Sequence, residues 1–155
     1  MSDRVSASIT IGGTLPADLL GQFARIVRHE GLSTDWDGPP FELSDISEGE
    51  PLRLMAHQVP WGHFGKLEAF CVANAIPFVR WCASCPGQWG PERVVFTGIG
   101  QPQGYDLDEA GNLVVSAEVI DRLGIEEAIA DHHAGADFDV PPLRLAVREK
   151  ETGNG

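Results

Sequence analysis

The chain has 155 residues, of which 23 are Asp or Glu and 11 are Lys or Arg, so its formal net charge is −12. This length predicts one domain with a sizeable core, and no apolar run reaches the roughly 20 residues of a membrane helix. A surface this acidic repels phosphate, which argues against direct nucleic-acid binding. The N-terminus lacks a signal-peptide pattern, so we expect a cytoplasmic protein without membrane contact.

The first third of the chain predicts a strand, a helix and a long loop. Residues 5–11 alternate apolar with small or polar side chains, which is typical of a strand. Thr14 is a favourable N-cap residue, and the helix that it would begin ends at Gly31, a residue typical of helix C-termini. Residues 33–49 are acidic and rich in turn formers, so we expect a long loop before a second strand at 52–59.

The rest of the chain alternates between helices and short strands. Apolar residues at helical spacing predict helices, and short apolar runs bounded by Gly and Pro predict strands. In chain order, the expected elements are a helix at 64–74, strands at 78–82 and 93–97, a hairpin of 105–107 with 113–116, a helix from Ser116 to 123 that resumes at 125–132, and a strand at 143–147.

This mixture of strand–helix–strand units and hairpins predicts an α+β fold. We expect a single domain over residues 1–148, in which helices cover one face of a mixed or antiparallel sheet. The favoured topology is a ferredoxin-like core with a C-terminal extension. Residues 149–155 are expected to form a disordered polar tail.

The acidic residues are concentrated in two segments. Residues 30–50 contain seven acidic residues and no Lys or Arg, and residues 104–139 contain ten acidic residues against a single basic one. Acidity of this kind also serves solubility, but it attracts basic partners as well. We therefore predict a protein partner with a basic surface, and we expect it to contact Asp35, Trp36, Asp37, Glu126, Glu127 and Asp131.

Three tryptophans lie in segments that are poor candidates for the core. Trp36 stands between two aspartates, and such an aromatic is a favourable interface anchor. Trp89 lies in a loop rich in Gly and Pro. We expect Trp61, near the start of the second helix, to cover the edge of the small core.

The stretch Trp81-Cys82-Ala83-Ser84-Cys85 resembles the beginning of a thioredoxin-type redox site. In that family the first cysteine lies at a helix N-terminus, which lowers the pKa of its thiol. Here Pro86 and Gly87 follow Cys85 and argue against a helix. Zinc is the other interpretation of Cys-x-x-Cys, but a structural zinc site needs four ligands.

Asp131-His132-His133 resembles the triplet of the DHH phosphoesterases, which follows a buried strand in that family. Residues 125–130 are instead predicted to be helical, so we expect the triplet to lie at an exposed helix end. We predict neither a cofactor nor a metal. The candidate ligands for a metal are Cys82, Cys85, His132 and His133.

Three functions follow from these observations. The favoured one is a non-catalytic inhibitor that competes with nucleic acid for a basic site, by analogy with small acidic phage and plasmid proteins that block restriction or CRISPR complexes. The first alternative is a metal- or thiol-dependent enzyme that uses Cys82, Cys85 and nearby histidines. The second is a structural subunit of a larger assembly, whose apolar contacts would resist salt.

Overall fold

The structure is a computed structural model that describes residues 4–146. Its centre is a five-stranded sheet with the strand order β3-β1-β4-β5-β6, in which every neighbouring pair is antiparallel. The strands of this sheet are β1 (Arg4–Ile11), β3 (Leu52–Pro60), β4 (Phe78–Cys82), β5 (Glu92–Phe96) and β6 (Gln103–Asp106). The helices are α1 (Leu20–His29), α2 (Gly65–Ala73), α3 (Ala117–Leu123) and α4 (Ile125–Asp137). The predicted α+β class is therefore confirmed.

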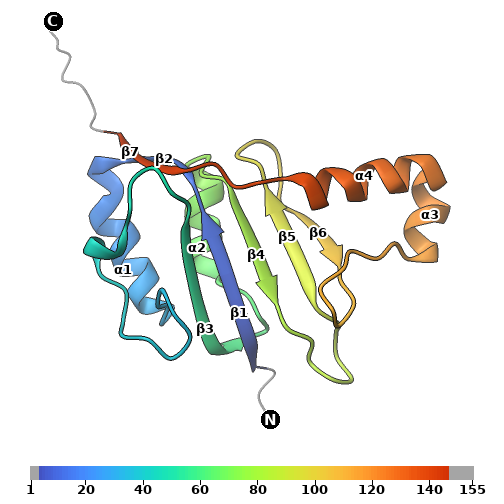
Figure 1. The fold of residues 1–155 in the computed structure, drawn as a ribbon, viewed down its shortest axis with the longest axis horizontal. Coiled ribbons are helices and arrows are strands. Elements are labelled where there is room, and N and C mark those ends of the chain that lie inside the picture. The colour runs from blue at the N-terminus through green and yellow to red at the C-terminus, as the bar shows by residue number, and fades with distance from the viewer. Residues whose placement is uncertain (1–3, 147–155) are drawn as a thin grey trace, which may run out of the picture.

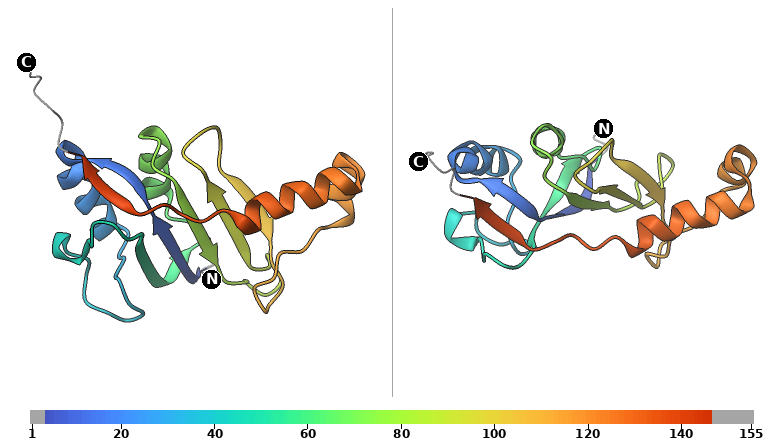
Figure 2. Two further views of the ribbon diagram at one scale, coloured as in Figure 1. Left: turned by 45° about the horizontal axis from the view of Figure 1, so that its top comes forward. Right: turned by 90° about the horizontal axis from the view of Figure 1, so that it is seen from above.

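The core lies between the sheet and helices α1 and α2, which lie together on one face of it (Figure 2). The ring centroid of Phe23 in α1 lies 6.1 Å from that of Phe41 and 5.9 Å from that of Phe70 in α2. On the sheet, Phe78 and Phe96 pack at 5.6 Å. All five rings are buried. Truncating a buried phenylalanine to alanine typically costs about 3–5 kcal/mol, so this cluster is a major source of stability.

Strands β3 and β4 lie on either side of β1, and both are antiparallel to it, so they run parallel to each other. Helix α2 connects them and completes a split β-α-β unit, the building block of ferredoxin-like folds. The likeness to that fold is limited to this unit. The five strands of the main sheet and helices α1 and α2 follow the order β-α-β-α-β-β-β, whereas a ferredoxin-like fold follows β-α-β-β-α-β.

The chain after α4 returns across one end of the sheet (Figure 1). There β7 (Leu143–Ala146) pairs in parallel with β2 (Gly13–Pro16). The backbone N–H of Gly13 donates to the Pro142 carbonyl at 3.1 Å. The neighbouring Gly12 has no room for a side chain, because its Cβ would overlap the Pro141 carbonyl oxygen. This glycine therefore permits the close approach of the two chain segments.

Two sequence predictions about elements are wrong. Thr14 does not cap a helix, because it belongs to β2, and α1 begins only at Leu20 after a short 3-10 turn (Ala17–Leu19). The expected hairpin is reduced to a turn: residues 113–116 form no strand, and Leu113 makes one isolated bridge to Leu107. In both cases tertiary contacts determine the secondary structure. Residues 13–16 form a strand because they pair with β7, and residues 113–116 do not form one because they have too few strand partners.

The other predicted elements are confirmed, mostly to within one residue. The helix predicted at 125–132 extends to Asp137, and the last strand covers 143–146. The expected tail at 149–155 lies outside the described residues. Within residues 4–146, no helix combines the length and the apolar character that crossing a membrane requires.

Candidate functional site

The acidic residues of the second segment lie mainly on two helices that project from the sheet. Helices α3 and α4, here called the acidic arm, extend beyond β6 (Figure 1). Ser116 Oγ accepts a hydrogen bond from the Val119 N–H at 3.2 Å and caps α3, and Gly124, at φ 85°, separates the helices. Arg122 is the single Lys or Arg in these two helices. The exposed carboxylates of the arm are Glu118, Asp121, Glu126, Glu127, Asp131 and Asp137.

The C-terminal half of α4 attaches the acidic arm to β5 and β6. Arg93 donates hydrogen bonds from Nε to the Gly135 carbonyl and from Nη2 to the Phe138 carbonyl, both at 3.0 Å. Tyr105 of β6 packs directly against Gly135, and its ring meets that of His132 edge-on at 5.2 Å. The first turn of α4 lies at the other end of the helix, away from this attachment.

That first turn exposes both charge and apolar area. Glu126 and Glu127 lie where carboxylates interact favourably with the helix dipole, so they stabilise α4 as well. Beside them, Ile125 is 61% exposed and Ile129 is 48% exposed. Charged groups steer a partner and buried apolar area supplies affinity. The end of the arm therefore has both features of a protein interface.

The first predicted acidic surface lies in the loop between α1 and β3. Trp36 is half-buried there, and its ring stacks on that of His57 with centroids 4.8 Å apart and planes inclined by 29°. Asp37 Oδ2 lies 3.6 Å from His57 Nε2, and Ser6 Oγ lies 2.7 Å from His57 Nδ1. These contacts hold the loop against the sheet and occupy part of the Trp36 ring.

Ser6, His57 and Asp37 are the residue types of a hydrolytic triad, but their arrangement does not suit one. The acid of such a triad is buried and orients the histidine. Here 83% of the Asp37 side chain is exposed, and its distance to the imidazole exceeds that of a hydrogen bond. The cluster is therefore better explained as a loop attachment than as a catalytic group.

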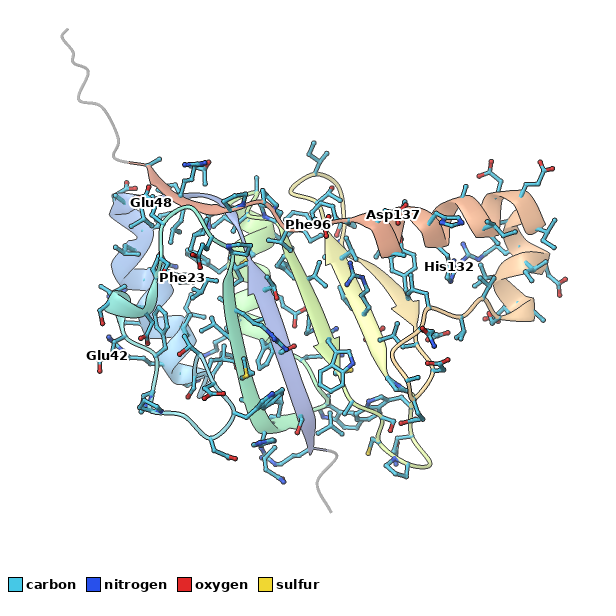
Figure 3. The ribbon with its side chains drawn as sticks, in the orientation of Figure 1. Phe23, Glu42, Glu48, Phe96, His132 and Asp137 are labelled. Atoms are coloured by element: carbon cyan, nitrogen blue, oxygen red, sulfur yellow. The ribbon has the colours of Figure 1, made fainter. Side chains whose placement is uncertain are left out.

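The two predicted acidic surfaces lie at opposite ends of the molecule. In Figure 3, Glu42 and Glu48 mark the loop end, and His132 and Asp137 mark the acidic arm. Asp35, Trp36 and Asp37 belong to the loop between α1 and β3, whereas Glu126, Glu127 and Asp131 belong to α4 of the acidic arm. A partner with a flat surface can therefore contact one set without contacting the other.

The Cys-x-x-Cys segment does not form a thioredoxin-type site. Cys82 ends β4 and is buried. No helix follows Cys85: its carbonyl accepts a hydrogen bond from the Gln88 N–H at 2.9 Å, and Gly87 has φ 80°, as expected for a turn. Burial raises the pKa of the Cys82 thiol, and Arg80 only partly opposes this effect. A redox-active first cysteine needs the opposite shift.

The four candidate metal ligands lie in separate parts of the chain. Cys82 and Cys85 lie at the end of β4, whereas His132 and His133 lie on α4. His132 Nδ1 is 3.0 Å from the Ala128 carbonyl in its own helix. Among the residues that the structure describes, no group of three or more His, Cys, Asp or Glu side chains is arranged to hold a metal ion.

A cavity of about 410 Å³, here called the tryptophan pocket, opens where the turn between β3 and α2 meets the loop between β4 and β5. Trp61 and Trp89 stand side by side in it, with ring centroids 5.7 Å apart. Trp61 was expected at the edge of the core, but it is 56% exposed. The side chains that line the pocket include Trp61, His63, Cys82, Trp89, Glu92 and Asp106.

No sequence pattern predicts this pocket. Its residues come from β3, β4, β5, β6 and the connections between them, so they share no spacing. In the sequence, Trp61 and Trp89 differ from the other apolar residues only in lying outside helical and strand patterns. A comparison with known proteins adds no further assignment, since no protein-family model, curated protein or solved structure matches the chain.

Proposed function

We propose that this protein binds a basic surface of another protein and competes there with nucleic acid. The observation that carries the proposal is the acidic arm, which projects from the sheet with six exposed carboxylates and a single Lys or Arg. A rod of carboxylates presents the charge that a phosphate-binding surface attracts. The same charge opposes direct nucleic-acid binding by the chain itself.

The arm is the stronger of the two predicted surfaces. Its carboxylates Glu126 and Glu127 stand next to exposed Ile125 and Ile129, so binding would remove apolar area from water as well. In the loop, by contrast, Asp37 lies near His57 and Trp36 is stacked on the same ring. We therefore assign the main contact to the arm and an auxiliary contact to the loop.

The competitor function is of the kind found in inhibitors of restriction or CRISPR complexes, and such an inhibitor needs no catalytic group. A structural subunit remains the second candidate, because Ile125 and Ile129 would also suit an apolar assembly contact. The two differ in their response to salt: steering by exposed charges is screened by salt, whereas apolar association is not.

The test is a capture experiment with three variants that each raise the net charge by two. One carries Glu126→Gln and Glu127→Gln, the second Asp35→Asn and Asp37→Asn. The third is the control, with Gln22→Lys and Gln101→Lys at exposed positions outside both surfaces. Tagged proteins are incubated with nuclease-treated host lysate, and the captured partner is quantified.

We expect the arm variant to lose most of the captured partner, the loop variant to lose less, and the control to retain it. Equal capture by the wild type and both acidic-surface variants would contradict the proposal. Equal losses in all three variants would also contradict it, because the effect would then follow net charge and not the arm.

A further inference from the structure

We propose that the tryptophan pocket binds a guanidinium group, namely that of an arginine side chain on the protein partner. That the arginine belongs to this partner rests on the proposed function. The preference for a guanidinium rests on the pocket itself, through its carboxylates, its aromatic rings and its size.

The carboxylates of the pocket repel one another. In the strand register Cys82 lies opposite Glu92, and Glu92 lies opposite Asp106, so the three residues form a row across β4, β5 and β6. Like charges directly opposite each other in an antiparallel pair are unfavourable. A bound cation between Glu92 and Asp106 would remove this repulsion.

The chain's own cation at this place is already engaged. Arg80 lies 3.4 Å from Glu92 (Nη2 to Oε1), but it also lies 2.9 Å from Glu68 (Nε to Oε2). One buried guanidinium therefore faces two carboxylates. Asp106 is exposed, and within residues 4–146 its carboxylate has no hydrogen bond or ion pair. The pocket thus keeps an excess of negative charge for a ligand.

The position of Trp61 is the second, independent observation. Its φ is 57°, and that of Gly62 is 69°, so the turn between β3 and α2 has two consecutive left-handed residues. Gly, Asn and Asp are usual at such positions, and a bulky residue there is a genuine outlier. Strain of this kind concentrates at functional sites. Here the left-handed turn leaves the Trp61 indole ring exposed in the pocket that Glu92 and Asp106 also line.

Trp89 completes the aromatic part of the pocket. Its Nε1 donates a hydrogen bond to the Ala83 carbonyl at 3.2 Å, which fixes the ring and uses its donor within the chain. What the Trp89 ring offers a ligand is therefore its face, and the exposed Trp61 ring stands beside it. Arginine stacks on aromatic faces and pairs with carboxylates through a planar set of donors. The compact, strongly hydrated ammonium of lysine matches this combination less well.

The volume of the pocket is suitable for one inserted arginine side chain. About 410 Å³ falls near the lower end of the range for small-molecule sites. Interface anchors of this type, in which one arginine fills a pocket with aromatic walls, contribute strongly to binding. The pocket therefore supplies specificity that a purely electrostatic contact through the acidic arm lacks.

The test uses purified protein and a capped amino acid, Nα-acetyl-L-arginine methylamide, with the citrulline analogue as its neutral isostere. The four tryptophan indole N–H signals are followed by NMR during the titration. We expect the signals of Trp61 and Trp89 to shift and those of Trp36 and Trp81 to stay. The citrulline analogue should bind at least about tenfold more weakly, since it lacks the charge.

Two variants and two control variants test whether the arginine probe binds in the tryptophan pocket. Trp61→Ala and Asp106→Asn should each weaken binding of the arginine probe about five- to tenfold. Glu50→Gln and Asp139→Asn, which remove exposed carboxylates outside the pocket and outside both predicted sets of contact residues, should leave it unchanged. Asp106→Asn removes a charge at an exposed site, so it tests the proposal even where Trp61→Ala perturbs the turn.

Equal affinity for the arginine and citrulline probes, or shifts of all four indole signals, would overturn the assignment. The outcome is separable from the proposed function. If the protein binds the arginine probe but captures no partner, the assignment of a guanidinium site stands. Only the claim that the arginine belongs to a protein partner is then contradicted. A captured partner together with no probe binding would contradict the pocket alone.

Discussion

Arg80 Nη1 donates a 2.8 Å hydrogen bond to the Gly62 carbonyl and thereby ties the middle of the sheet to the turn that carries Trp61. The same side chain lies beside Glu68 of α2 and Glu92 of β5. Its Nε faces Glu68 at short range but without the alignment of a hydrogen bond. Arg80 therefore joins a strand, a helix and a turn, and it contacts Glu92, a residue that lines the tryptophan pocket.

Replacing Arg80 with alanine should be strongly destabilising. The substitution leaves two carboxylates without their cation, and breaking a largely buried ion pair from one side typically costs about 3–5 kcal/mol. Urea denaturation measures the change in the free energy of unfolding. Arg25→Ala, at an exposed position on α1, is the matched control and should cost less than about 0.5 kcal/mol. Equal effects of the two substitutions would show that the Arg80 network contributes nothing.

Gly62 should tolerate alanine much less well than Gly31. Both glycines have positive φ, 69° and 73°, so each alanine carries a backbone cost of about 1–2 kcal/mol. At Gly62 the new Cβ would also lie 2.7 Å from Cys82 Cβ, whereas nothing lies within 4 Å at Gly31. Overpacking adds about 1–3 kcal/mol. We therefore expect Gly62→Ala to lower the free energy of unfolding by more than Gly31→Ala, and similar values would argue against the close packing of the turn on β4.

A second pair of glycines tests how the acidic arm is attached. Helical Gly→Ala substitutions gain up to about 1 kcal/mol of helix propensity, and Gly65→Ala in α2 meets nothing within 4 Å. Gly135→Ala in α4 places a Cβ 2.5 Å from the Tyr105 ring. We expect Gly65→Ala to stabilise the protein and Gly135→Ala to destabilise it and to speed hydrogen exchange in α4. Stabilisation by both substitutions would mean that α4 does not pack on β6 as described.

Cys71 makes stability depend on pH in the alkaline range. Burial, with a smaller effect of Glu68, raises the pKa of its thiol to about 12. Above roughly pH 8.5 the unfolded chain releases this proton while the folded chain retains it. The unfolded state then binds fewer protons, so stability falls by up to about 1.4 kcal/mol per pH unit until the folded pKa is reached.

The variant Cys71→Ala should therefore show a shallower loss of stability between pH 9 and pH 11 than the wild type. The comparison is made by urea denaturation at a series of pH values. Cys85→Ala, which removes a thiol outside the buried core, is the control for the substitution itself. An unchanged slope in Cys71→Ala would contradict the assignment of this pH dependence to the buried thiol.

Local sequence patterns predicted most helices and strands, because side-chain periodicity and capping residues determine where these elements form. The alternation of side chains predicted the first strand, apolar residues at helical spacing predicted α2, and the helix expected from Ser116 begins there because the Ser116 side chain caps α3. Strand β2 could not be predicted from local pattern, since its single strand partner within residues 4–146, β7, comes more than 120 residues later in the chain. Residues 113–116 have the composition of a strand, yet in the part of the chain that the structure describes they make a single β-bridge, from Leu113 to Leu107.

The two candidate sites also differ in how far local sequence predicts them. The acidic arm was visible in the sequence because its residues are consecutive, and so was the absence of a helix after Cys85. The tryptophan pocket was not, because strand register alone brings Glu92 beside Asp106. The left-handed conformation of Trp61 was equally hidden, since a Trp-Gly pair before a helix is compatible with several turns.

The most direct test of the proposed function is displacement of the captured partner by nucleic acid. Wild-type protein loaded with its partner is washed with increasing salt and, separately, with increasing amounts of a DNA or RNA fragment. We predict that the partner is released by salt and by nucleic acid, and that less of either is needed for the Glu126→Gln, Glu127→Gln variant. A partner that stays bound at high salt and in excess nucleic acid would contradict competition for a basic site and would favour an apolar assembly contact.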